Sequence, residues 1–231
     1  TPDVDEVILG GGGVIEGVKS GSVVIDMSTI SPQATREIAT RLKEKGAAML
    51  DAPVSGGDIG ALNATLSIMV GGDAEVFQRC RSILAAMGKN IVHVGPNGMG
   101  QTVKLMNQIL VAGNLNAVAE AMLFAQKSGA DLEKAISAVK GGAAGSWVLT
   151  NLGPRIIKRD FSPGFMIDLI QKDLKLIMEA AAEMRLPLPA TGLIHQMYYS
   201  LQCSGEGRSG TQALVKALER IAGVEVGHPE I

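Results

Sequence analysis

The sequence has few of the residues that bind metals, form disulfides or stack on nucleic-acid bases. Its 231 residues include two cysteines and three histidines, and aromatic residues make up 3%. Cys80 and Cys203 lie far apart and in no metal or redox spacing, which favours free thiols in a reducing cytoplasm, and we expect both in the core. Because His93, His195 and His228 have no carboxylate or cysteine at ligand spacing, we predict no metal site.

The sequence also lacks concentrated charge of one sign. Its 21 basic and 23 acidic residues give a net charge of -2 and are spread along the chain. Phosphodiester backbones and anionic lipids attract runs of positive charge, so we expect neither nucleic acid nor a membrane as a partner. The apolar stretch at 108–124 carries Asn114, Asn116 and Glu120, and we expect it to fall short of a membrane span.

Apolar residues are plentiful, at 46% of the chain, and their pattern changes near residue 96. Before it, short apolar segments alternate with helical patterns, which is typical of βαβ units on a parallel sheet. Ser31 and Asp73 can cap two of these helices, the first of which should end at Gly46. Strands are predicted at residues 23–27, 48–50, 65–70 and 90–94.

After residue 96 we find only helical patterns. A helix without internal proline is predicted from Gly98 to about Ser128, and further helices at 131–140, 168–184, 190–202 and 211–222. The predicted fold class is α/β: the C-terminal part of a doubly wound Rossmann-type parallel sheet, followed by an all-α domain with a long leading helix. The predicted domains are 1–96 and 97–231.

A glycine-rich phosphate-binding turn is missing. A doubly wound nucleotide domain opens with a strand, the turn G-x-G-x-x-G and a helix whose N-terminus holds the pyrophosphate. The glycines at 10–13 meet Glu16 where the third glycine should stand, and those from Gly98 meet Val103. We interpret the run at 10–13 as a turn. We also expect that the front of the nucleotide domain is absent from this chain, which starts at Thr1 between two elements.

The first segment that could carry chemistry is D-A-P-V-S-G-G at 51–57. It follows a predicted strand at its carboxyl end, where open parallel sheets bind ligands. Gly56 and Gly57 would let backbone N–H groups approach an anion closely, which suits a carboxylate. A strand-to-loop turn that needs glycine for its backbone angles would give the same pattern.

The second segment lies in the first turns of the long helix. Lys104, Asn107 and Gln108 share one face there, and Gly100 lies one turn earlier on the same face, where it would leave room for a bound molecule. Polar groups in an apolar helix need partners or a cleft, and a solvated stripe is the alternative. The third segment, at 161–174, is a proline-glycine loop followed by Lys172 and Asp173; alone, it is typical of a helix with surface charges.

Four motifs occur in a family-specific order and spacing: S-T-I-S-P at 28–32, the segment 51–57, G-x-x-x-K-x-x-N at 100–107 and K-D-L at 172–174. Over nearly the whole chain, the sequence resembles the β-hydroxyacid dehydrogenases, the 3-hydroxyisobutyrate dehydrogenase-like family. The segments 141–149 and 104–108 most resemble its tartronate semialdehyde (2-hydroxy-3-oxopropionate) reductases. Many relatives have Asn where this sequence has Gln108, although Gln can make the same hydrogen bonds.

The resemblance implies an NAD(P)-dependent enzyme in which Lys104 is the catalytic acid and base. It gives the proton to the carbonyl oxygen as hydride arrives and takes it back in the oxidation direction. The implied substrate-binding residues are Ser55, Gly56, Gly57, Asn107 and Gln108. The implied cofactor contacts are Thr29, Phe165, Lys172 and Asp173.

Some implications stay open. The residue that selects NAD or NADP lies on a strand that this chain does not contain, and without the front segment we expect weak cofactor binding. The expected substrate is 2-hydroxy-3-oxopropionate, with 3-hydroxyisobutyrate, glyoxylate and succinic semialdehyde as alternatives. A fragment that acts only as a folded dimerisation module is the alternative of another class. The resemblance implies a cytoplasmic homodimer or homotetramer that associates through its helical domain.

Overall fold

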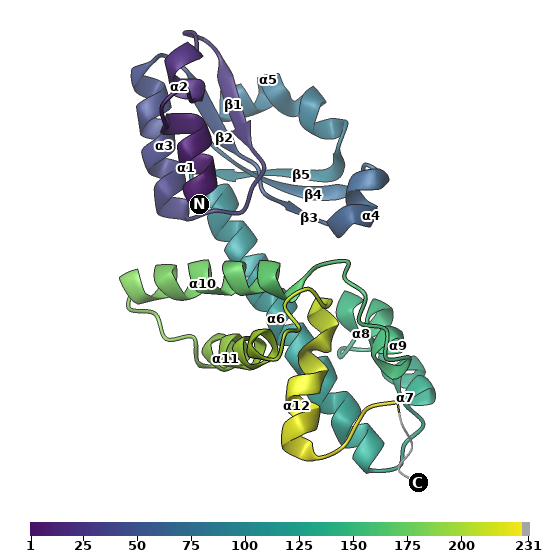
Figure 1. Ribbon diagram of the computed structural model, residues 1–231. Coiled ribbons are helices and arrows are strands. Elements are labelled where there is room, and N and C mark those ends of the chain that lie inside the picture. The colour runs from purple at the N-terminus through teal and green to yellow at the C-terminus, as the bar shows by residue number, and fades with distance from the viewer. Residues whose placement is uncertain (228–231) are drawn as a thin grey trace. The chain divides into compact units, whose positions relative to one another are not determined.

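The structure, a computed structural model, describes residues 1–227, and the chain divides within its longest helix (Figure 1). One unit comprises residues 1–107 and the second begins at Gln108. We call them unit 1 and unit 2. The predicted domains, 1–96 and 97–231, place the division at the start of this helix instead. His228 lies outside the described residues.

Unit 1 is an α/β unit that ends in the first turns of α6. Its strands are β1 (Val23–Asp26), β2 (Ala48–Asp51), β3 (Val54–Ser55), β4 (Leu66–Gly71) and β5 (Gly88–Gly95). Its helices are α1 (Pro2–Leu9), α2 (Val14–Gly17), α3 (Pro32–Glu44), α4 (Gly57–Leu62), α5 (Ala74–Ala85) and the start of α6 (Met99–Lys127). The four predicted strands are confirmed as β1, β2, β4 and β5.

The sheet is rich in parallel pairs but contains one reversal. β1 pairs with β2 and β4 pairs with β5, both in parallel. β4 runs antiparallel to both β2 and β3, through Asp51 opposite Gly71 and Ser55 opposite Ser67. β2 and β3 thus act as one strand interrupted at Pro53, which has no N–H to donate to a ladder. The alternating pattern of apolar segments did not predict this reversal.

Helices cover both faces of the sheet, as the Rossmann-type prediction requires (Figure 1). Met49 on β2 packs in one cluster with Ile38 and Leu42 of α3. Its neighbour Leu50 belongs to another cluster, which contains Leu84 of α5. Because successive strand residues point to opposite faces, these two clusters are the cores on the two sides of the sheet.

The predicted helix signals act as expected at the ends of α3 and α5. The Ser31 side chain accepts a hydrogen bond from the N–H of Ala34, and Asp73 accepts from the N–H groups of Glu75 and Val76. Gly46, just after α3, has a φ of +73°, which a residue with a Cβ adopts only with strain. Capping and glycine placement therefore confirm these helix limits. The glycine run at 10–13 forms the turn between α1 and α2.

Unit 2 is helical, and α6 leads into it. The other helices are α7 (Leu132–Val139), α8 (Trp147–Asn151), α9 (Gly153–Ile157), α10 (Ile167–Glu183), α11 (Pro189–Cys203), the 3-10 turn η1 (Thr211–Ala213) and α12 (Leu214–Ala222). Among the described residues after β5, the only β-type pairing is an isolated bridge between Met166 and Gly210. The long leading helix and four later helices are confirmed, whereas α8 and α9 lie where loops were predicted.

Two expectations need correction. Cys80 is buried, but Cys203 is exposed, because it is the last residue of α11 on the side away from the core. Helix α6, which contains the stretch 108–124, does meet a length and composition test for a membrane span, with a mean hydropathy of 1.3 over an 18-residue window. Core helices of soluble proteins pass the same test, and Gln101, Lys104 and Gln108 are buried on this helix.

Candidate active site

A stripe of polar residues on α6 is buried. Gln101, Lys104 and Gln108 are 0%, 8% and 2% exposed, at the i, i+3 and i+7 spacing that places them on one face. Asn107, beside them, is half-buried. Burying a lysine and two amides costs free energy unless they have partners, so this face is held by contacts. The alternative of a solvated stripe is therefore wrong for Lys104 and Gln108.

Asp51, the last residue of β2, fixes the start of α6. Its side chain is fully buried and accepts hydrogen bonds from the N–H groups of Gly98, at 2.9 Å, and Gln101, at 3.1 Å. Burial raises the pKa of Asp51, while these N–H groups act in the opposite direction. An acceptor at the N-terminus of a helix satisfies N–H groups that have no partner within the helix. Asp51 thus ties β2 to the turn just before Lys104.

This junction leaves no room for side chains on two glycines. A Cβ on Gly100 would lie 2.5 Å from the Asp51 carbonyl oxygen and 2.6 Å from that of Met69. A Cβ on Gly71 would lie 2.6 Å from the Asp51 carboxylate. Gly100 was predicted to leave room for a ligand. The structure shows instead that its missing Cβ permits the close approach of α6 and the sheet.

Gln101 connects α6 with the loop that follows β1. Its Nε2 donates to the carbonyl oxygen of Ser28 at 2.8 Å, and its Oε1 accepts from the N–H of Ile30 at 3.1 Å. These two groups flank Thr29, which is half-buried at the carboxyl end of the strand. The loop that contains Thr29, the predicted cofactor contact, is thus bound to the turn of α6 that precedes Lys104, the predicted catalytic residue.

The predicted carboxylate-binding residues lie where β3 turns into α4. Ser55 ends β3, and Gly56 and Gly57 are exposed, with φ angles of +138° and +64°. A Cβ on Gly56 would also lie 3.1 Å from the Leu66 side chain. These glycines therefore adopt the backbone angles of a turn that needs glycine. Both residues are exposed, and carboxylate binding by their N–H groups stays a prediction.

Unit 2 holds the other predicted site residues. Asp173 on α10 is 2% exposed, and its Oδ2 accepts a 2.6 Å hydrogen bond from Gln108 Nε2. Lys172 Nζ lies 2.9 Å from Asp173 Oδ1 as an ion pair that lacks hydrogen-bond geometry. Phe165, half-buried, precedes α10 by two residues. In the third sequence segment, Asp173 is thus a buried acid with two partners and not a surface charge on a helix.

The described residues fit the nicotinamide end of a dinucleotide. The carboxyl end of β1 presents Thr29 in a loop held by Gln101, at the edge of the sheet where α/β folds bind ligands. Asp26, also at that edge, is 8% exposed and has one carboxylate oxygen without a hydrogen bond. No group of three or more His, Cys, Asp or Glu side chains within residues 1–227 could hold a metal ion.

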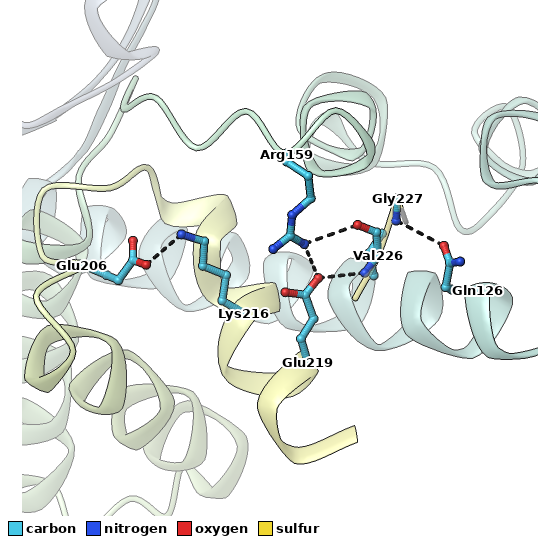
Figure 2. A network of polar contacts seen from close by, with 7 residues as sticks. All are labelled: Gln126, Arg159, Glu206, Lys216, Glu219, Val226 and Gly227. Atoms are coloured by element: carbon cyan, nitrogen blue, oxygen red, sulfur yellow. Dashed lines mark hydrogen bonds and ion pairs between the residues drawn. The ribbon is translucent and has the colours of Figure 1, made fainter. Parts of the chain in front are cut away.

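A separate polar network ties the end of the described chain to unit 2 (Figure 2). Figure 2 shows Arg159 contacting Glu219 and the carbonyl oxygen of Val226, while Gln126 of α6 accepts from the N–H of Gly227. A cavity of about 470 Å³ is lined by Arg159, by residues of α12 and by the three residues that follow α12. None of the predicted site residues belongs to this network.

Sequence reasoning missed two residues of this region, Asp51 and Gln101. Gln101 offered a signal, since it lies three residues before Lys104 on the same face of an apolar helix. Its partners could not be predicted, because they lie 71 and 73 residues away. Asp51 was noted only as the start of the glycine segment.

Two family models match almost the whole chain. Residues 1–95 match the NAD-binding domain of 6-phosphogluconate dehydrogenase, and residues 98–218 match the NAD-binding domain of NADP-dependent 3-hydroxyisobutyrate dehydrogenase. The chain is 47% identical to the 2-hydroxy-3-oxopropionate reductase of Escherichia coli (strain K12), over 96% of this chain and 76% of that protein.

Solved structures give the same result. The crystal structure of a 3-hydroxyisobutyrate dehydrogenase from Salmonella typhimurium superposes with a TM-score of 0.82 at 33% identity, covering 93% of this chain and 75% of that one. The 3-hydroxyisobutyrate dehydrogenase of Mycobacterium tuberculosis, solved with L-serine, has a TM-score of 0.82 at 32% identity, covering 88% and 72%.

Proposed function

The chain belongs to the β-hydroxyacid dehydrogenase family, and we propose that it reduces 2-hydroxy-3-oxopropionate to the corresponding 3-hydroxy acid, with Lys104 as the proton donor. As a member of this family it is an oxidoreductase, and its cofactor is NAD or NADP. The observation that carries the proposal is the burial of Lys104 on a helix turn that Asp51 and Gln101 fix in place. We assign residues 1–96 to cofactor binding and 97–231 to substrate binding and dimerisation.

Lys104 is suited to the proton step. When bound, the nicotinamide would supply hydride to the carbonyl carbon of the substrate, and the carbonyl oxygen would gain negative charge. An ammonium group held about 3 Å from that oxygen stabilises the charge and provides the proton. The same amine accepts the proton when the hydroxy acid is oxidised. Because the first turns of α6 are anchored to β2, Lys104 needs little reorganisation to act.

The remaining predicted residues bind and orient. In the proposal, Ser55 and the exposed N–H groups of Gly56 and Gly57 hold the substrate carboxylate, and Asn107 orients the substrate beside Lys104. Gln108 is proposed as a further substrate contact, held in place by its bond to Asp173. Thr29, Phe165, Lys172 and Asp173 are proposed to contact the cofactor.

A substrate panel tests the proposal. The full-length protein is assayed with NADH and NADPH against 2-hydroxy-3-oxopropionate, glyoxylate and succinic semialdehyde, and with NAD and NADP against 3-hydroxyisobutyrate. We expect the highest kcat/KM for 2-hydroxy-3-oxopropionate. A higher kcat/KM for another of these compounds would change the proposed substrate but not the proposed type of reaction. Absence of turnover with all four would contradict the proposed reaction.

We also propose that the protein is a cytoplasmic homodimer or homotetramer. Leu110 and Phe124 of α6 are 57% and 77% exposed, and Trp147 of α8 is 69% exposed. Large apolar side chains exposed on one helical unit are candidates for an interface. Sedimentation equilibrium should give a mass of two or four chains, and a monomer mass would contradict this part.

A further inference from the structure

We propose that Gln101 is a positioning residue that holds the loop at Ser28 to Ile30 against the helix turn next to Lys104, and so sets the geometry of hydride and proton transfer. This inference rests on the proposed function. Gln101 itself is fully buried and does not reach a ligand, so it acts through Thr29 and Lys104.

The two hydrogen bonds of Gln101 fix both peptide groups of Thr29. The Ser28 carbonyl belongs to the peptide before Thr29, and the Ile30 N–H belongs to the peptide after it. Holding both peptide planes fixes the φ and ψ of Thr29 and therefore the direction of its side chain. One amide can do this because it carries a donor and an acceptor.

The loop is held on its other side as well. The N–H of Ser28 donates to Asp26 Oδ1 at 3.0 Å, and Ile30 is 1% exposed. Thr29 therefore lies between Ser28, whose N–H is bound to Asp26, and Ile30, whose side chain is buried. Gln101 binds the backbone of both neighbours. Without Gln101, the buried N–H of Ile30 and the part-buried carbonyl of Ser28 would lose these hydrogen bonds.

The support of Gln101 is itself rigid. The N–H of Gln101 donates to Asp51 at 3.1 Å, so its backbone is bound to β2 while its side chain is bound to the loop after β1. Lys104 is one helical turn further on. A continuous set of hydrogen bonds thus relates Thr29 to Lys104 through one residue.

Precise placement matters because hydride and proton transfer depend steeply on distance. A misplacement of about 1 Å can lower a rate by about 100-fold. Loss of fold stability alone acts differently, since it lowers the fraction of active protein and leaves the chemistry of the folded fraction unchanged. The two cases can therefore be separated by measurement.

The test compares Gln101→Met, which keeps the size and removes both hydrogen bonds, with Leu84→Ala, which destabilises the other core cluster of unit 1. Gln101→Glu serves as a second variant, since it keeps the size and an acceptor for the Ile30 N–H. In the full-length protein, kcat, KM and the primary deuterium isotope effect with 4-deuterated cofactor are measured. Amide exchange at Ser28 to Ile30 is measured without cofactor.

For Gln101→Met we expect kcat to fall about 10- to 100-fold, with the KM of the acid changed less than about threefold and a larger isotope effect. Amide exchange at Ile30 should rise at least about tenfold. Leu84→Ala should melt at a lower temperature but keep the wild-type isotope effect. Gln101→Glu should lie between wild type and Gln101→Met.

A wild-type isotope effect and kcat in Gln101→Met, with faster exchange at Ile30, would overturn the positioning role. Unchanged exchange at Ile30 would overturn the structural basis of the proposal. If the wild-type protein turns over none of the candidate substrates, the proposed function fails. The exchange measurement then still decides whether Gln101 holds the loop.

Discussion

Among the predicted site residues and their supports, the buried polar side chains of the two units bind different kinds of partner. In unit 1, Asp51 and Gln101 bind backbone groups, two N–H groups at the start of α6 and two groups that flank Thr29. In unit 2, Gln108 of α6 pairs with Asp173 of α10, which joins side chains of separate helices. Backbone partners fix a loop where the chain leaves a strand, whereas side-chain partners fix the packing of helices.

This difference indicates where chemistry is placed. Loops at the carboxyl ends of strands need external support to hold a reactive geometry, and unit 1 provides it through buried side chains from α6 and β2. In unit 2 the helices already satisfy their own backbones, so buried polar pairs contribute to register and orientation. Loss of the Gln101 bonds in unit 1 should therefore affect turnover, whereas the Gln108–Asp173 pair in unit 2 should contribute to stability.

The largest expected effect is that of Lys104→Ala. Removal of the proton donor should lower kcat by about 100-fold or more while the Kd of the cofactor stays nearly the same. Steady-state kinetics and a fluorescence titration with NADPH measure the two quantities. Lys89→Ala, at an exposed position of β5, is the control and should behave as wild type. Turnover near the wild-type level in Lys104→Ala would remove the lysine from the mechanism.

Asp51→Ala should be the most destabilising change at the junction of β2 and α6. It leaves the N–H groups of Gly98 and Gln101 without an acceptor in a buried position, at a cost of about 2–3 kcal/mol in the free energy of unfolding. Urea unfolding measures this cost. A loss below about 0.5 kcal/mol, the range of surface substitutions, would show that the junction does not depend on Asp51.

Asp173→Asn tests the buried acid of unit 2, for comparison with Asp51 of unit 1. The amide can still accept from Gln108 but cannot pair with Lys172, so we expect a loss of about 1–2 kcal/mol in stability. Glu179→Gln, in an exposed pair with Lys175 on the same helix, is the control and should cost less than about 0.5 kcal/mol. Equal costs for both variants would contradict the importance of burial.

The smallest expected effects are changes of stability with pH. The contributions of Asp51 in unit 1 and His195 in unit 2 should change with pH in opposite directions. Burial raises the pKa of Asp51 above its usual 3.8, so its contribution to stability is present below pH 3.8 and is lost as pH rises through the raised value. Burial lowers the pKa of His195 below 6.5, so its contribution is present above pH 6.5 and is lost as pH falls through the lowered value.

Urea unfolding of the wild type, Asp51→Asn and His195→Gln across pH 4 to 8 tests these signs. The stability difference between wild type and Asp51→Asn should shrink as pH rises from 4. The difference between wild type and His195→Gln should shrink as pH falls below 6.5. Differences that stay constant with pH would contradict the assigned causes of the pKa shifts.

Much of the fold followed from local sequence signals. Ser31, Asp73 and Gly46 gave the limits of α3 and α5, because caps and left-handed glycines act within a few residues of a helix end. The short helices α8 and α9 have five residues each and lie in a segment rich in glycine, where periodicity carries little information.

The site was only partly predictable for a related reason. Lys104 and Gln108 could be placed on one helix face, because that needs only helical geometry. Neither the antiparallel course of β4 nor the bonds of Asp51 and Gln101 could be predicted, because their partners lie about 50 to 70 residues away in sequence. Such contacts are fixed by the tertiary fold and leave no local periodic pattern.

The central claim is that Lys104 transfers the proton during hydride transfer. It is tested most directly by a single turnover of the full-length protein, with enzyme and bound NADPH in excess over 2-hydroxy-3-oxopropionate and cofactor absorbance as the signal. The account predicts that Lys104→Ala slows this phase by about 100-fold or more at unchanged cofactor occupancy. A rate constant equal to that of the wild type would contradict it.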